Sequence, residues 1–273
     1  MSRTADHGLF GPDSVSWRID REVLVLAGGS CALLMQLAHP AVAAGVAEHS
    51  DFRADPFARL RRTLAASYAV VFGSTPRAER AIRRMNAIHA SVGGIVPETG
   101  EPYSALDPAL LLWVHATLVD TAIRVYDRFV APLPDAEAEA YHAEARQIAV
   151  RLGAPDGSLP DTLEDLRAEM DRLMGSGEVR VTATARSLAP AVLYPTRFPP
   201  RPVWDLAHLV SLSVLPPAIR RGYGIHWSRR HGRGVELLAS ACRRVLPLVP
   251  DPLRHVPAAR SAESRLRRAR SGR

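Results

Sequence analysis

The chain contains no lysine, and all 35 of its basic residues are arginine. This absence excludes lysine as a metal ligand, a general base or a Schiff-base nucleophile. The bias toward arginine is typical of GC-rich coding sequence, so one arginine alone carries little functional weight. Cysteine is almost as rare, because Cys31 and Cys242 are far apart and fit no metal or redox motif. We expect two reduced thiols in a cytoplasmic protein.

Acidic residues are scarce near the C-terminus. Seven arginines lie between Arg254 and Arg273, against the single acid Glu263, and they supply much of the formal charge of +7. We predict that residues 256–273 form a basic, disordered tail, with at most weak contact to an anionic membrane. Because no aromatic residue interrupts these arginines, the tail indicates no specific nucleic-acid partner.

The N-terminus lacks the apolar core of a secretory signal, and residues 1–17 read as a loose arm. The apolar stretch Val23–Ala47 is 25 residues long and holds no acid or arginine. However, Gly28–Ser30 lies within it, and Gln36 and Pro40 break its end, so we expect no transmembrane segment. We predict instead a buried helix over residues 18–38, whose small residues let another helix approach its backbone closely.

Alternation of apolar and polar residues, the sign of strands, is nearly absent, and no internal repeat occurs. Apolar residues instead recur at helical spacing, so we predict an all-α fold of about nine or ten helices. Asp107 before Pro108, and Thr162 with Asp165, are predicted helix starts, and residues 93–107 are predicted to form a loop. With 47% hydrophobic residues, the chain can bury one large core, which we assign to residues 18–255.

The stretch 55–94 predicts two helices joined by a tight turn. Asp55 can cap the first helix, with Pro56 at its first position, and Gly73 can end it. Ser74 or Thr75 then begins the second helix. The two helices should therefore lie side by side as a hairpin.

This hairpin offers a candidate cofactor site. On the second helix His89 shares a face with Ile82 and Met85, so its imidazole should point inward. On the first helix Arg59 and Thr63 lie four residues apart, on one line. Together they suit an anionic, metal-bearing cofactor, although ordinary packing explains the same pattern. Three other histidines compete as ligands: His39, His49 and His115.

Other catalytic motifs are missing. The sequence has no HExxH, no GxSxG and no phosphate-binding loop. A di-iron bundle needs two Glu-x-x-His motifs, whereas Glu139–His142 is one match in a polar segment, which we interpret as a solvated helix face. Asp120 and Arg124 should satisfy each other at i,i+4. A haem remains possible because one helical histidine suffices to bind its iron.

Seven short motifs follow one another along the chain: QLAHPAVAAGVAEHSDF (36–52), DPFARLRRTL (55–64), VFG (71–73), IHASVGG (88–94), YSALDP (103–108), LLWVHATLVD (111–120) and LPPAIRRGYGIHW (215–227). Together they resemble the family that joins the MpaB-type oxygenases to the catalytic domain of rubber oxygenase, the latex-clearing protein. The resemblance spans about residues 18–255.

The resemblance implies a globin-like helical core that binds haem b and uses O₂ on a hydrophobic, olefinic or lipid-like small molecule. It implies His89 as the proximal iron ligand, supported by Arg59 and Thr63. Rubber oxygenases can carry a distal lysine ligand just before the threonine, and Arg62 stands there in this chain. A protonated guanidinium is a very poor metal ligand, so we expect no lysine-type distal ligation.

Several points stay open at this stage. The resemblance places no catalytic base, and Glu48 is only the nearest acid on the N-terminal side. A haem protein without turnover, acting as a sensor, carrier or electron-transfer module, is the alternative to an enzyme. The reductant and the oligomeric state are not indicated by the sequence.

Overall fold

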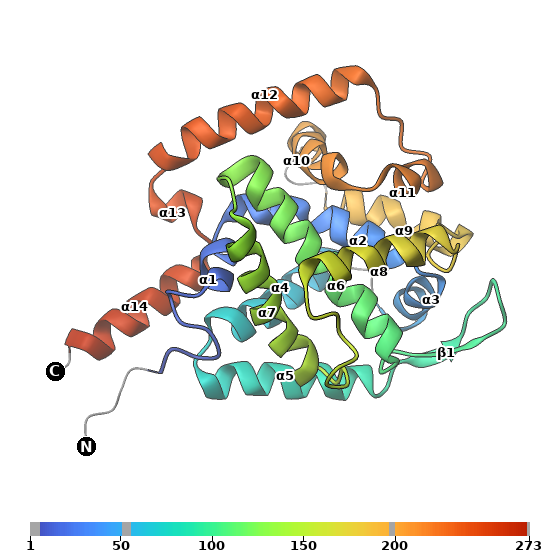
Figure 1. Cartoon of the computed structure of the whole chain (residues 1–273), viewed down its shortest axis with the longest axis horizontal. Coiled ribbons are helices and arrows are strands. Elements are labelled where there is room, and N and C mark those ends of the chain that lie inside the picture. Colours follow the sequence, from blue (N-terminus) through green and yellow to red (C-terminus); the bar gives the residue numbers. More distant parts are fainter. Residues whose placement is uncertain (1–5, 51–55, 197–199, 272–273) are drawn as a thin grey trace.

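The computed structural model describes residues 6–50, 56–196 and 200–271, and the fold is all-α, as predicted (Figure 1). The elements in chain order are α1 (Val15–Asp20), η1 (Val23–Gly28), α2 (Gly29–Leu37), α3 (Pro40–His49), α4 (Pro56–Phe72), α5 (Thr75–His89), β1 (Gly93–Ile95), β2 (Pro102–Ser104), α6 (Pro108–Val125), η2 (Tyr126–Val130), α7 (Asp135–Arg151), α8 (Leu163–Gly175), α9 (Ala183–Leu193), α10 (Arg201–Val214), α11 (Pro217–Gly222), α12 (Arg229–Val245), η3 (Leu246–Leu248), α13 (Asp251–Arg254) and α14 (Pro257–Ser271).

Capping residues set several of these helix starts. The Asp107 carboxylate accepts a hydrogen bond from the Ala109 backbone N–H at 2.8 Å, next to Pro108 at the first position of α6. The Thr162 hydroxyl accepts from the Asp165 N–H at 3.1 Å and starts α8. Both starts confirm the predicted signals. The predicted Asp55 cap lies outside the described residues.

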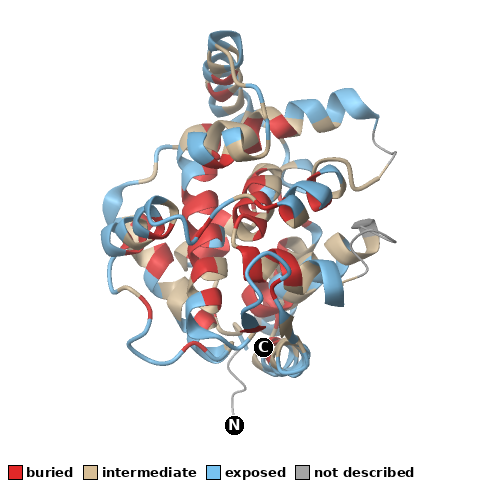
Figure 2. Cartoon of the chain, turned by 90° about the vertical axis from the view of Figure 1, so that its right-hand side faces the viewer, coloured by how far each residue is buried: buried red, intermediate tan, exposed pale blue. Residues whose placement is uncertain are grey.

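The core is built around α6, which crosses the middle of the molecule (Figure 1), and the buried residues gather in the interior (Figure 2). Trp113 is fully buried, and its indole N–H donates to the Met35 carbonyl of α2 at 3.0 Å. Gly28 packs directly on α6, since a Cβ there would lie 2.8 Å from Cγ2 of Val125. This confirms that the small residues of the N-terminal stretch permit a close helix approach.

One helical segment, Pro108–Val130, is long and apolar enough to cross a membrane, and 67% of its apolar window is buried inside the fold. Packing against neighbouring helices accounts for that composition. Val23–Leu37 and Pro40–His49 meet the same criterion as a pair, but the two parts are bent by 106° at the break. The bend falls where Pro40 was expected to end the first helix.

The prediction of one continuous helix over 18–38 was wrong. The chain leaves α1 after Asp20, passes through the short η1 and re-enters helix at Gly29. The Glu22 carboxylate explains the break, because it is 1% exposed and accepts from the Arg254 guanidinium at 2.9 Å. A buried carboxylate needs such a partner, so the backbone turns here to meet the C-terminal segment.

The prediction of a disordered tail was also wrong for residues 257–271, which form α14. Ala259, Ala262 and Leu266 are buried against Trp17 and Phe72, in a small core separate from the main one. The spacing of the three residues places them on one helical face. Arginines lie on the other side of α14, so the composition of the segment alone did not indicate its apolar face.

The N-terminal arm is likewise packed in its described part, residues 6–17. Phe10 is 5% exposed and Trp17 is fully buried. The Asp6 carboxylate accepts from the Thr75 backbone N–H at 3.0 Å and caps the start of α5. The arm therefore fastens onto the α4–α5 hairpin and is not loose.

The segment 93–107, expected to be a loop, contains a short antiparallel ribbon in which Gly94 of β1 pairs with Tyr103 of β2. The Tyr103 hydroxyl donates to the Glu48 carboxylate at 2.9 Å. A Cβ at Gly94 would lie 3.0 Å from that hydroxyl, so glycine is required for this approach. The ribbon ties the end of α5 to the end of α3.

Candidate functional site

The α4–α5 hairpin carries the predicted site. The two helices run antiparallel and join at Gly73, where a Cβ would lie 2.1 Å from the Ala69 carbonyl oxygen. Arg59 and His89 are about equally far from this turn along the chain. The antiparallel packing therefore brings both residues to the open end of the hairpin, away from the turn, as the sequence suggested.

His89 is the last residue of α5, and its side chain is half-buried. Its Nδ1 is inaccessible to solvent and has no hydrogen-bond partner among the described residues. Burial lowers the pKa of the imidazole, which keeps the ring neutral. A neutral imidazole with an unengaged nitrogen is the form of histidine that binds iron.

Arg59 lies near the start of α4, and its Nε–H donates to the Ser50 hydroxyl at 3.0 Å. Its pKa is lowered by burial and by the charge of Arg62. The half-buried Arg59 guanidinium thus lies close to a second positive charge near the start of α4. Such a region favours an anionic ligand group.

Thr63 lies one helical turn from Arg59, but its side chain is exposed, and so is that of Arg62. No hydrogen bond of the Thr63 hydroxyl is found within the part of the chain that the structure describes. Of the predicted trio, Arg59 and His89 are half-buried, whereas Thr63 is exposed to solvent.

The competing histidines are engaged in local structure. His39 Nδ1 accepts from the Ala41 N–H at 3.3 Å and caps α3. His49 Nε2 lies 3.0 Å from the Gly93 carbonyl of the ribbon. Each hydrogen bond gives the imidazole a structural role in the backbone around the hairpin, one as a helix cap and the other as a contact to the ribbon.

His115 packs against a second histidine, His142 of α7, with their ring centroids 6.1 Å apart. Burial first, then the charges of His142 and Arg146, lower the pKa of His115 to about 4. His142 is fully buried, and its Nε2 donates to the Pro160 carbonyl at 3.1 Å. Interpreting Glu139–His142 as a solvated face was wrong for His142.

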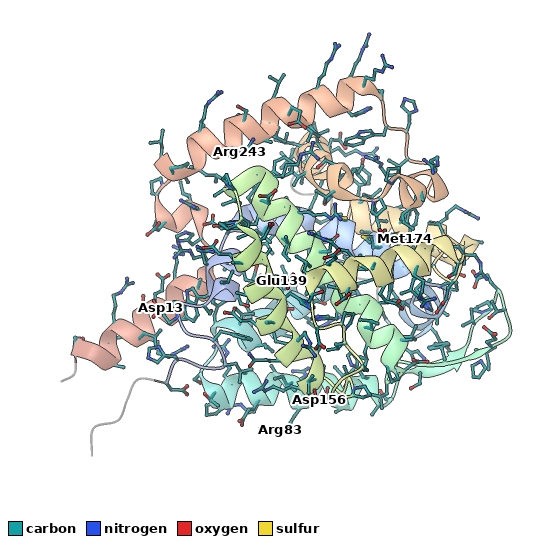
Figure 3. The ribbon with its side chains drawn as sticks, viewed as in Figure 1. Asp13, Arg83, Glu139, Asp156, Met174 and Arg243 are labelled. Atoms are coloured by element: carbon teal, nitrogen blue, oxygen red, sulfur yellow. The ribbon has the colours of Figure 1, made fainter. Side chains whose placement is uncertain are left out.

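This histidine pair was missed at the sequence level, although a signal was present. His142 shares a helical face with Ala138, Ala145 and Ala149, which form an apolar stripe within an otherwise charged segment. Glu139 lies beside that stripe and accepts from the Leu163 N–H at 3.0 Å, at the start of α8 (Figure 3). The polar composition of α7 hid a buried imidazole and a helix cap.

Leu118 is an apolar exception on α6. Its side chain is 52% exposed, whereas Thr117 and Val119 beside it are buried. It lies between the α6 face that contacts α2, through Trp113, and the face that contacts α7, through His115. A half-exposed leucine in the most buried helix offers an apolar contact for a ligand.

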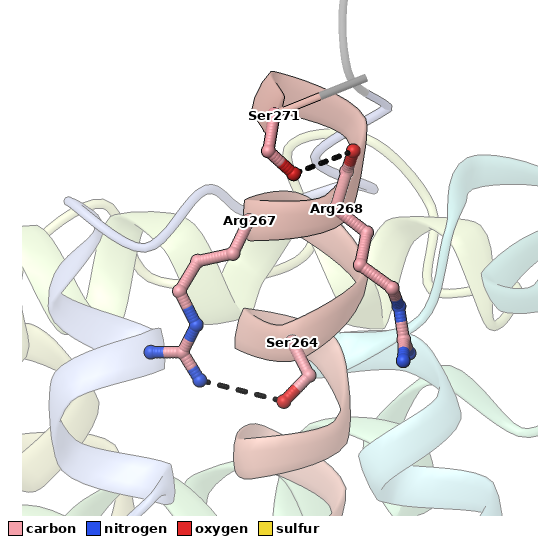
Figure 4. Close-up of a pocket in the computed structure, with 4 residues that line it drawn as sticks. All are labelled: Ser264, Arg267, Arg268 and Ser271. Atoms are coloured by element: carbon pink, nitrogen blue, oxygen red, sulfur yellow. Dashed lines mark hydrogen bonds between the residues drawn. The ribbon is translucent and has the colours of Figure 1, made fainter.

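Two surface hollows lie elsewhere. One is a charged groove between α6, α8 and the α10–α11 junction, where Asp120 accepts from Arg124 at 2.5 Å and from Arg167 at 2.8 Å. The expected Asp120–Arg124 pair is thus confirmed within a three-residue network. The other lies on α14, between Ser264, Arg267, Arg268 and Ser271 (Figure 4). The charges of the first groove are paired with each other, and the hollow on α14 is shallow, so we do not consider either of them a reaction site.

The described residues contain no group of three or more His, Cys, Asp or Glu side chains placed to hold a metal ion. A cofactor that carries most of the ligands of its own metal ion needs fewer ligands from the protein. It needs one protein ligand and a partner for its charged groups, and His89 with Arg59 can supply both.

Comparison with known proteins identifies the family. The family described as ER-bound oxygenase mpaB/B′/Rubber oxygenase, catalytic domain, matches residues 17–244. The chain belongs to this family. It is therefore an oxygenase, and the resemblance carried by the seven motifs is confirmed.

Curated relatives of this oxygenase include two mycobacterial proteins. Uncharacterized protein Mb2261 of Mycobacterium bovis and Uncharacterized protein Rv2237 of Mycobacterium tuberculosis are each 29% identical to it over 229 residues. The alignment covers 80% of this chain and 87% of each relative. No solved structure matches the chain.

Proposed function

We propose that this oxygenase depends on haem b, held by His89, and acts on an apolar small molecule in the cytoplasm. The observation that carries the proposal is the half-buried, neutral His89 with an unengaged Nδ1, at the same end of the hairpin as Arg59. The family supplies the oxygenase activity, and this pair of residues supports the choice of cofactor.

The residues present fit a haem in two respects. The imidazole of His89 offers a ring nitrogen to iron, and the cationic Arg59 beside Arg62 offers charge to the carboxylates at the rim of the macrocycle. Thr63 adds a hydroxyl one turn away, on the solvent side of the same helix. A guanidinium is a very poor metal ligand, so Arg62 would not act as the distal ligand.

When bound, the haem would supply the O₂ chemistry of the reaction. The chain's own residues would position the cofactor and exclude water. Arg59 is oriented by its hydrogen bond to Ser50, and the ribbon β1–β2 holds the segment that follows His89. Leu118, exposed on α6, would offer an apolar contact to a hydrophobic substrate.

Absorption spectra of His89→Ala test the cofactor assignment. We expect the purified protein to show a Soret band that shifts on reduction, and the variant to lose most of that band because no other ligand replaces the imidazole. His49→Ala is the matched control, since His49 also ends a helix and contacts the ribbon. An unchanged spectrum in His89→Ala would refute the ligand assignment.

The substrate class is tested separately, with the reduced protein and a series of isoprenoid and fatty-acid alkenes. Substrate-dependent uptake of O₂ is the expected result, and Leu118→Asp should lower it by raising KM for the alkene. O₂ uptake that is unaffected by any apolar substrate would overturn the proposed substrate class and leave the haem assignment standing.

A further inference from the structure

The outer face of α12 and the turns that follow it are unusual because three leucines there are strongly exposed. α12 lies along one edge of the molecule (Figure 1), where Val235 and Ala239 on its inner face are buried against η2 and α10. On the other side Leu237 is 74% exposed, and Leu248, just past the helix, is 81% exposed. Leu253 of α13 follows at 74%, and these are the three most exposed large apolar side chains of the described residues.

Arginines surround these leucines. α12 carries five exposed arginines: Arg229, Arg230, Arg233, Arg243 and Arg244. Its single acid, Glu236, is already paired with Arg128 at 2.5 Å. Within the described ranges, none of the five forms an ion pair, and Figure 3 shows nitrogen-tipped side chains along α12 that point away from the body. The face therefore carries net positive charge that the protein itself does not neutralise.

Charge and apolar groups occupy the same line. At 3.6 residues per turn, Arg230 and Arg233 fall on the same outward line of the helix as Leu237, and Arg244 continues it toward Leu248. An arginine in this setting can lay its aliphatic stem along an apolar surface while its guanidinium reaches a polar one. A partner surface that offers hydrocarbon to the leucines and anionic groups to the arginines would bind both kinds of side chain.

We propose that the outer face of α12, with the turn through Leu248 and Leu253, docks onto the surface of an anionic lipid bilayer. The leucines would enter the boundary between headgroups and acyl chains, while the arginines contact lipid phosphates. A second copy of the chain fits less well, because a symmetric contact would place the unneutralised arginines of both faces together. A nucleic acid would leave the leucines exposed to water. This proposal is independent of the haem assignment.

Co-sedimentation with lipid vesicles tests the charge component. The probes are vesicles of phosphatidylcholine alone and of phosphatidylcholine with about one third phosphatidylglycerol. We expect binding to the anionic vesicles only, weakened by salt. Arg230→Gln with Arg233→Gln should reduce it roughly 30-fold, at about a fivefold contribution per arginine. The matched control is Arg267→Gln with Arg268→Gln on α14, which should bind as the unmodified protein does.

The apolar component is tested with Leu237→Ser and Leu248→Ser, against Ile95→Ser of the ribbon, which is 57% exposed. We expect the two leucine variants to lose ~10-fold in vesicle binding and the isoleucine variant to lose none. All three positions are exposed, so circular dichroism should show an unchanged fold. The proposal is wrong if anionic vesicles fail to bind the protein, if the α14 or ribbon variants lose as much binding, or if sedimentation velocity shows a dimer that the leucine variants dissolve.

Discussion

His115 and His142 are kept neutral by burial, each beside Arg146, which disfavours a further positive charge. Below the ordinary histidine pKa of about 6.5, the unfolded chain takes up protons that the folded chain refuses. Protonation therefore favours the unfolded state, and stability present above that pH is lost as the pH falls toward the folded pKa of about 4 for His115. At the residue scale, this pair therefore makes the fold less stable in acid.

Between pH 7 and pH 4, we expect the titration of His115 to lower the free energy of unfolding by up to about 3 kcal/mol. His115→Leu, which keeps the apolar volume and removes the titrating group, should flatten that dependence. Urea unfolding at several pH values measures the effect, and exposed His226→Gln is the control. An equal acid dependence in His115→Leu and the unmodified protein would show that other groups control it.

At the element scale, the α4–α5 hairpin depends on its turn. Gly73 approaches the Ala69 carbonyl so closely that a Cβ would lie 2.1 Å from its oxygen, and the Gly8 backbone packs on the other side of the same turn. Backbone atoms cannot move aside as a flexible side chain does. The turn therefore determines how the two helices align, and with them the positions of Arg59 and His89 at the open end of the hairpin.

Gly73→Ala should therefore cost about 2 kcal/mol in unfolding free energy, and it should lower haem retention together with stability. Gly29→Ala is the matched control, because nothing lies within 4 Å of a Cβ there and its backbone is helical. Alanine at that position should be neutral or stabilising by a few tenths of a kcal/mol. Thermal unfolding with a haem titration measures both. Equal stability of the two variants would contradict the packing argument.

At the scale of the whole molecule, the two ends of the chain are joined through the hairpin. Trp17 near the N-terminus contacts Phe72 of α4 edge to face, with ring centroids 5.0 Å apart, and α14 closes the same cluster with Leu266. The Glu22–Arg254 ion pair makes a second connection between the ends. The C-terminal helix therefore stabilises the hairpin that carries the candidate site.

Leu266→Ala should destabilise the protein by about 2–4 kcal/mol, since the side chain is 4% exposed and leaves a cavity. Arg267→Ala, one position away and exposed, should change stability by less than about 0.5 kcal/mol. Urea denaturation followed by tryptophan fluorescence measures the effect, and Trp17 in the cluster is one of the four tryptophans that contribute to the signal. If α14 were dispensable, both substitutions would have equally small effects.

The sequence alone determined the helical class, the caps at Asp107 and Thr162, the Asp120–Arg124 pair and the hairpin with His89 at its end. These follow from interactions within about four residues along the chain, which a sequence displays directly. The family also followed, because its motifs are local strings.

Only the tertiary structure decided the burial of His142, the order of α14, the break at Glu22 and the exposure of Leu237 and Leu248. The first three depend on partners more than a dozen residues away: His142 on Pro160, α14 on Trp17, and Glu22 on Arg254. The two leucines are exposed because no other part of the chain that the structure describes packs on them. Composition describes what a segment contains, whereas burial depends on what the rest of the chain brings against it.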